Sequence, residues 1–211
     1  MQSRKLLYQN DIRFLAAAGE WTPAQWAQPS LCTHWRNHDV LAHLALGYRA
    51  SGTQMAVSML RRGGSFDWSN AVLAQRLAQR RSPAELLEDF AIGMSAPRGL
   101  GRIFPRRLLL GDHVIHELDI RFALGLDSTV GPVQLAAVLD TQVHLPNPFI
   151  PSRAWARGLS LRAEDLDWRH GDGPTVAGNA AHLASVLAGR PWALQHLHGD
   201  GVDVLRDRLA G

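Results

Sequence analysis

Three polar side chains on apolar helix faces are the residues of this sequence best suited to chemistry. In segment 106–125, Asp112 and His116 fall on or beside the apolar stripe. Because residues four apart share a helix face, this carboxylate and this imidazole can point to one place. His43 lies in the same way beside the apolar residues of an earlier predicted helix. Two histidines and a carboxylate suit zinc or another divalent metal and leave coordination positions open. The residues alone also allow a second interpretation, in which all three are hydrogen-bonded core side chains.

Two further residues could take part in such a site. Asp119 follows one turn later on the same predicted helix, where it could orient a metal ligand or form a local ion pair with Arg121. Cys32, the single cysteine, stands in a predicted loop without an obvious base beside it, and we interpret it as structural. A single cysteine cannot form an intrachain disulfide, which agrees with a reducing compartment.

A competing metal site is conceivable near the end of the sequence. His196 and His198 have an H-x-H spacing beside Asp200, and such a set can also bind metal. However, Gly199 and Gly201 flank Asp200 and are typical of a turn before a last helix. We therefore interpret this region as a turn.

Apolar residues at helical spacing predict the elements that would position these side chains. A tryptophan-rich loop is expected over 20–35, and Ser82 with Pro83 is typical of an N-cap followed by the first helical residue. Gly19 and Gly125 are expected to end the helices that precede them. Helices are predicted over 4–18, 39–60, 69–80, 83–94, 106–125 and 131–143.

The pattern changes after the break at residues 146–148. Residues 158–173 alternate between apolar and polar side chains, which predicts two strands with a turn near Glu164. Residues 175–190 return to helical spacing, and a last helix is expected over 202–209. The predicted fold class is mainly α, with a helical bundle over 1–148 followed by a small C-terminal α/β domain over 149–211.

Composition excludes several classes of function. With 211 residues and 46% hydrophobic content, the chain can bury a sizeable core. Lys and Arg number 22 against 19 Asp and Glu, and basic groups such as Arg102, Arg106 and Arg107 are interpreted as solvated helix ends, so nucleic-acid binding is not expected. No stretch approaches the roughly 20 apolar residues that a membrane helix needs, and charged residues interrupt the first segment. We expect a cytoplasmic protein that does not bind membranes.

Several motifs resemble a known family. The strings PSLCTHW, DVLAHLALGYRA and GDHVIHELDIRFALGL are similar to those of the DinB-like superfamily, specifically the actinobacterial mycothiol-dependent maleylpyruvate isomerases. The tail, from GDGPTVAGNAAHLASVLAGRP to HGDGVDVLRDRL, resembles the small sterol-carrier-like domain of that branch. The resemblance implies a DinB-like four-helix bundle that binds metal, followed by that domain.

The resemblance also implies a ligand set. In the family, a histidine in the motif that reads DVLAHL here holds the metal together with a carboxylate and a histidine four residues apart. This correspondence assigns His43, Asp112 and His116 as metal ligands. The family more usually has glutamate where this chain has Asp112, so this ligand is one methylene shorter. Asp119 is then a candidate to orient a ligand.

The function implied by the resemblance is that of a metal-dependent enzyme with mycothiol as thiol cofactor or co-substrate. It would be an isomerase or an S-transferase acting on a small electrophile or carboxylate, as a monomer or a homodimer. Arg76 and Arg80 are expected at the mouth of the pocket, or else on a solvated helix face. His34 and His38 could line the same mouth, but we prefer to place them in the tryptophan-rich loop. The alternative is a non-catalytic protein of the same fold, which either binds a metal and a ligand or acts as a regulator.

Overall fold

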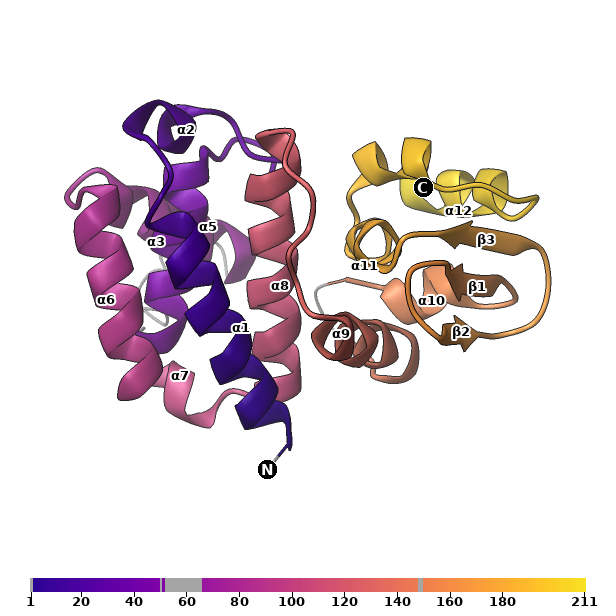
Figure 1. Ribbon diagram of the computed structural model, residues 1–211, viewed down its shortest axis with the longest axis horizontal. Helices are drawn as coiled ribbons and strands as arrows, with labels where there is room; N and C mark the ends of the chain where they lie inside the picture. The colour runs from indigo at the N-terminus through magenta and orange to yellow at the C-terminus, as the bar shows by residue number, and fades with distance from the viewer. Residues whose placement is uncertain (1, 50, 52–65, 148–149) are drawn as a thin grey trace. The chain divides into compact units, whose positions relative to one another are not determined.

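The computed structural model describes residues 2–49, 51, 66–147 and 150–211. They form two compact units, Met1–Leu109 with Asp119–Asp127, and Leu110–Leu118 with Ser128–Gly211 (Figure 1). The first unit is helical, and the second combines helices with a small sheet. The predicted class, a helical bundle with a small α/β part, is confirmed.

Helix α3 is the central element of the first unit. It packs against α2, α5, α6 and α7, while α1 packs against α6. The core is apolar and aromatic: the rings of Phe14 and Tyr48 lie 5.7 Å and 5.5 Å from the ring of Phe90. Burial of such rings is a main source of the stability of a bundle. The helices are α1 (Gln2–Ala18), α2 (Pro23–Ala27), α3 (Asn37–Arg49), α5 (Phe66–Ala78), α6 (Pro83–Ser95), α7 (Leu100–Ile103) and α8 (Arg106–Ala123).

Local sequence signals explain where several of these helices begin. Ser82 caps α6, since its hydroxyl accepts from the backbone of Glu85 and the Glu85 carboxylate accepts from the backbone of Ser82. The same reciprocal pattern joins Thr22 and Gln25 at the start of α2. The expectation of a loop throughout 20–35 was therefore wrong, because this short capped helix interrupts it.

Predicted and observed helix ends in the first unit differ by a few residues, and the difference is largest for the predicted helices 39–60 and 69–80. The helix predicted over 39–60 runs from Asn37 to Arg49, and its predicted continuation over 52–60 lies outside the described residues. The helix predicted over 69–80 begins three residues earlier, at Phe66, and ends at Ala78.

The second unit contains a three-stranded sheet in the order β2-β1-β3 (Figure 1). The predicted hairpin is confirmed: β1 (Ser160–Ala163) pairs antiparallel with β2 (Trp168–His170). The helix predicted from 175 was wrong at its start, because Thr175–Gly178 forms β3, parallel to β1. Gly178, the last residue of β3, has a φ of 157°, and the N-cap Asn179 lies between this strand and the helix that follows. The other elements are α9 (Pro132–His144), α10 (Ser152–Ala156), α11 (Ala180–Leu187), η1 (Pro191–His196) and α12 (Val202–Ala210).

The outer side of β3 is closed by the chain segment before α12. Ala177 and His198 exchange two backbone hydrogen bonds of 2.8 and 2.9 Å. The backbone N–H of Gly201 donates to the carbonyl of Thr175, and the Asp200 carboxylate accepts from the N–H of Thr175. Helix α11 packs against α9 and against β1 and β3, which gives the sheet one covered face.

Candidate metal centre

Helix α8 carries two of the three predicted metal ligands. It is continuous from Arg106 to Ala123, and its two ends belong to the first unit. Because a helix is a continuously hydrogen-bonded rod, these ends also fix its middle turns. The Asp112 Oδ1 and His116 Nε2 atoms lie 3.6 Å apart, with side chains 33% and 14% exposed. This separation is too long for a hydrogen bond. It is close to the roughly 3.4 Å between two tetrahedral ligands of zinc with bonds of about 2.1 Å.

His43 comes from the middle of α3 and is buried. Its ring lies 5.3 Å from the ring of Trp35, and its Nδ1 is 3.0 Å from the side-chain nitrogen of Asn70 on α5. The packing of α3 against α5 brings this partner into place. His43 is therefore held by a ring contact and a polar contact, which restricts the orientation of its other nitrogen.

The three predicted ligands come together. One ligand atom each from His43, Asp112 and His116 lies within 4.8 Å of the other two. A metal held by all three needs ligand separations of roughly 3.4 Å, so side-chain rotations that shorten any separation by at most about 1.4 Å would complete the set. Two imidazoles and one carboxylate, buried or half-buried, are donors that fit zinc or a similar divalent ion.

Cys32 and Asp119 form a pair beside this group. The Cys32 thiol donates to Asp119 Oδ2 at 2.9 Å, and the backbone N–H of Leu31 donates to the Asp119 carbonyl at 3.2 Å. Ligand atoms of Cys32, His116 and Asp119 also lie within 4.8 Å of one another. Sequence reasoning missed this partner of the cysteine, because 87 positions separate the two residues. The Arg121 side chain donates from Nε to the carbonyl of Asp127 at 2.6 Å.

The predicted arginines lie at the surface. Arg76 is in the last turn of α5 and Arg80 just after it, and both side chains are exposed. The carbonyl of His34 accepts from the side chain of Gln75 at 3.2 Å, so the tryptophan-rich loop is tied to α5. His34 adopts a φ of 66°, which is uncommon for a residue other than glycine.

The competing histidines near the end of the chain have other partners. The ring of His196 stacks on that of His182 at 4.3 Å. His198 Nε2 lies 3.2 Å from a carboxylate oxygen of Glu164. Among the described residues, the groups suited to hold a metal do not include either histidine.

None of the described helices is both long enough and apolar enough to span a bilayer.

Comparison with known proteins adds a family and a fold. Residues 9–97 match the family model described as "Mycothiol maleylpyruvate isomerase N-terminal domain". The chain is similar to the crystal structure of a mycothiol-dependent maleylpyruvate isomerase, with a TM-score of 0.52 and 14% identity over 90% of this chain and 88% of that chain. A histidine-to-alanine mutant of the isomerase gives the same values. No curated protein matches. The resemblance inferred from the sequence is thus confirmed by a family match over residues 9–97, and a solved isomerase has a similar fold over most of the chain.

Proposed function

We propose that this protein is a metal-dependent enzyme that uses mycothiol as its thiol cofactor or co-substrate, acting as an isomerase or S-transferase on a small electrophile. One observation carries the proposal: ligand atoms of His43, Asp112 and His116 lie within 4.8 Å of one another. The family match over residues 9–97, which includes one of these histidines, supports the choice of thiol. The similar fold of a mycothiol-dependent isomerase supports the class of reaction.

The proposed metal ligands are His43, Asp112 and His116, with zinc as the best-suited ion. A divalent ion with open positions lowers the pKa of a bound thiol and so makes a thiolate available at neutral pH. The protein contributes the approach to such a site: the Asp112 side chain is one-third exposed, so this side is open, whereas His43 is buried.

Asn70 is a positioning residue in this proposal. A histidine that offers Nε2 to a metal carries its proton on Nδ1, and that N–H needs an acceptor. The Asn70 side chain lies 3.0 Å from His43 Nδ1, and its amide can present oxygen there because the two ends of an amide are interchangeable in shape. Asn70 would then fix both the tautomer and the ring orientation of His43.

The reacting thiol has to come from outside the chain. Cys32 is the single cysteine, and its thiol is engaged with Asp119. Arg76 and Arg80 are exposed on and just after α5, where they remain candidates to meet an acidic substrate or the cofactor. An isomerase returns the thiol unchanged whereas an S-transferase leaves it on the product, so mass analysis of the product separates the two reactions.

The first experiment measures metal in the purified protein and in single variants. His43→Ala and His116→Ala should each lose most of the bound zinc. His198→Ala is the matched control, because this histidine is 64% exposed, lies beside Glu164 and belongs to neither candidate metal group of the described residues. If both site variants keep the metal of the parent protein, the ligand assignment is wrong.

The second experiment replaces the metal with cobalt and adds mycothiol. Direct binding of the thiol should change the visible spectrum of cobalt, and a thiol of similar size without the mycothiol sugars should act more weakly. A metal-loaded protein whose cobalt spectrum does not respond would contradict the proposed enzyme. That result would instead favour a non-catalytic metal-binding protein.

A further inference from the structure

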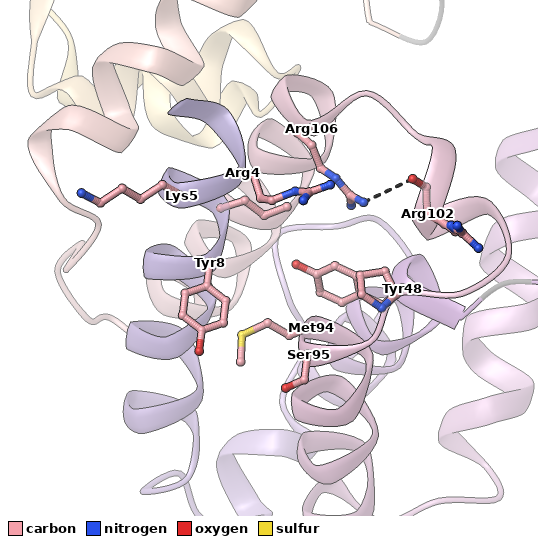
Figure 2. Close-up of a pocket in the computed structure, with 10 residues that line it drawn as sticks. Arg4, Lys5, Tyr8, Tyr48, Met94, Ser95, Arg102 and Arg106 are labelled. Atoms are coloured by element: carbon pink, nitrogen blue, oxygen red, sulfur yellow. Dashed lines mark hydrogen bonds between the residues drawn. The ribbon is translucent and has the colours of Figure 1, made fainter. Parts of the chain in front are cut away.

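A cleft lies in the first unit, between the start of α1, the end of α6 and the start of α8. Its volume is about 820 Å³, a size typical of sites for small organic ligands (Figure 2). None of the residues that line it is a candidate metal ligand. Its basic lining residues are Arg4, Lys5, Arg102 and Arg106, and its aromatic ones are Tyr8 and Tyr48.

The cleft concentrates positive charge without acidic residues. Four of its lining residues are Arg4, Lys5, Arg102 and Arg106, and no Asp or Glu is among the ten that line it. In Figure 2 these basic side chains lie along one side of the view, opposite Tyr8, Met94 and Ser95. Within the described part of the chain, none of the four forms an ion pair. Their charges are therefore left for a ligand or for solvent.

The N-termini of helices α1 and α8 make the electrostatic potential of the cleft more positive. Arg4 and Lys5 lie in the first turns of α1, and Arg106 is the first residue of α8, while neither helix has an acidic residue in its first turn. A helix N-terminus carries partial positive charge and normally favours acidic side chains. The basic residues are thus placed where they repel the helix ends. The sequence interpretation of Arg102 and Arg106 as ordinary solvated helix ends was incomplete, because both line a shared cleft.

One guanidinium is held in place. Arg106 donates from Nη1 to the carbonyl of Gly101 at 2.8 Å and from Nη2 to the carbonyl of Arg102 at 3.3 Å. Both acceptors are neutral, so the charge of Arg106 is positioned but not neutralised. A charge fixed in advance loses less side-chain entropy when it binds an anion.

The remaining wall offers apolar contact. Tyr48 is 2% exposed, and its hydroxyl donates to the buried carboxylate of Asp11, so the hydroxyl is not available to a ligand. Tyr8 is 49% exposed, and Leu7, Met94 and Pro97 complete this wall. An occupant would meet cationic groups on one part of the cleft and rings or aliphatic groups on another.

We propose that this cleft binds a small organic anion, in which a carboxylate or phosphate group is carried on an apolar body. The anionic group meets Arg4, Arg102 and Arg106, and the apolar body packs against Tyr8 and its neighbours. The site is separate from the proposed metal centre, so its test stands apart from that of the proposed function.

The test uses the fluorescent sulfonate 8-anilinonaphthalene-1-sulfonate, with neutral N-phenyl-1-naphthylamine as the matched uncharged probe. Arg4→Gln and Arg102→Gln remove charge from exposed side chains that form no hydrogen bond or ion pair within the described protein, so folding is not expected to change. Each should weaken binding of the sulfonate by about twofold to fivefold, and the double variant by about tenfold, because each charge is partly screened by solvent. The neutral probe should be unaffected.

Arg107→Gln is the control variant. This arginine follows Arg106 on α8, is exposed and does not line the cleft. Its removal changes the net charge by the same amount and should leave sulfonate binding unchanged. Equal binding of the sulfonate to the parent and to the double variant would overturn the proposal, as would an equal loss in the Arg107→Gln control.

Competition then identifies the anionic group. Displacement of the sulfonate by phenyl phosphate or by benzoate supports the proposal, and the stronger competitor identifies phosphate or carboxylate as the preferred group. Failure of both to compete overturns it. If inorganic phosphate competes as well as phenyl phosphate, the apolar part of the proposal is wrong.

Discussion

Replacing Tyr48 with phenylalanine removes one hydroxyl from the core and leaves the ring in place. The hydroxyl donates to Asp11, and both side chains are buried. A hydrogen bond to a charged group stabilises a protein by about 1.5–3 kcal/mol, and no cavity forms because the ring remains. For a chain of 211 residues, this loss corresponds to a decrease in Tm of roughly 3–12 °C.

The same substitution has a pH signature. Burial raises the pKa of Tyr48 well above its ordinary value near 10, and the adjacent Asp11 carboxylate raises it further. Above pH 10, an unfolded chain releases the phenol proton while the folded protein keeps it. The folded state then binds more protons, so this contribution to the free energy of unfolding is complete below pH 10 and decreases by about 1.4 kcal/mol per pH unit above it. Tyr48→Phe lacks this dependence, and the stability difference between parent and variant should narrow above pH 10.

Urea unfolding followed by circular dichroism at pH 7, 10 and 11 measures both effects. Tyr8→Phe serves as the control, because this tyrosine lies on α1 and is half-exposed. It should change the free energy of unfolding by less than about 0.5 kcal/mol. A Tyr48→Phe variant as stable as the parent at pH 7 would refute the role of the hydrogen bond. A stability difference that stays constant from pH 7 to pH 11 would refute the raised pKa.

Three further predictions concern the metal centre and the helices. Asp112→Glu should tighten zinc binding because it lengthens the shortest ligand, whereas Asp112→Asn should weaken zinc binding at least about tenfold. Competition with a chelator measures both affinities. Weaker zinc binding by Asp112→Glu would contradict the assignment of Asp112 as a ligand that is too short. Asn70→Asp keeps an acceptor for the His43 ring and should retain zinc, while Asn70→Leu should lose about tenfold to 100-fold in affinity by the same assay. Gly111→Ala should stabilise α8 by about 0.5–1 kcal/mol, because no atom beyond the neighbouring helix backbone lies within 4 Å of the added methyl. Gly101→Ala should destabilise the protein, because its methyl would lie 2.6 Å from a backbone oxygen of α3. Thermal unfolding of the two glycine variants should therefore shift in opposite directions.

Local signals accounted for much of the fold. Ser82 followed by Pro83 and Glu85 predicts the start of α6 because capping is decided within four residues. The equivalent pattern at Thr22 was present in the sequence and was overlooked within a tryptophan-rich segment. β3 could not be recognised locally, because Thr175–Gly178 becomes a strand only by pairing with β1.

For the candidate site too, the local sequence predicts some features, whereas others depend on the tertiary fold. The positions of Asp112 and His116 follow from helical periodicity, so their approach could be predicted from spacing alone. The partner of Cys32 could not, because Asp119 reaches it through the tertiary fold. The basic cleft joins α1 to α8 across about half the chain, and no local pattern shows which solvated arginines will converge.

The closed side of β3 leaves fewer sheet edges on which another chain could add a strand. A strand with unpaired N–H and C=O groups is a template on which another chain can add a strand. β3 pairs with β1 on one side, and on the other its backbone is occupied by His198 and Gly201. The opposite edge is β2, which has three residues and an exposed Arg169 at its centre. A short charged edge is a poor template for an added strand, and the turn around Asp200 covers the other edge by occupying the backbone of β3.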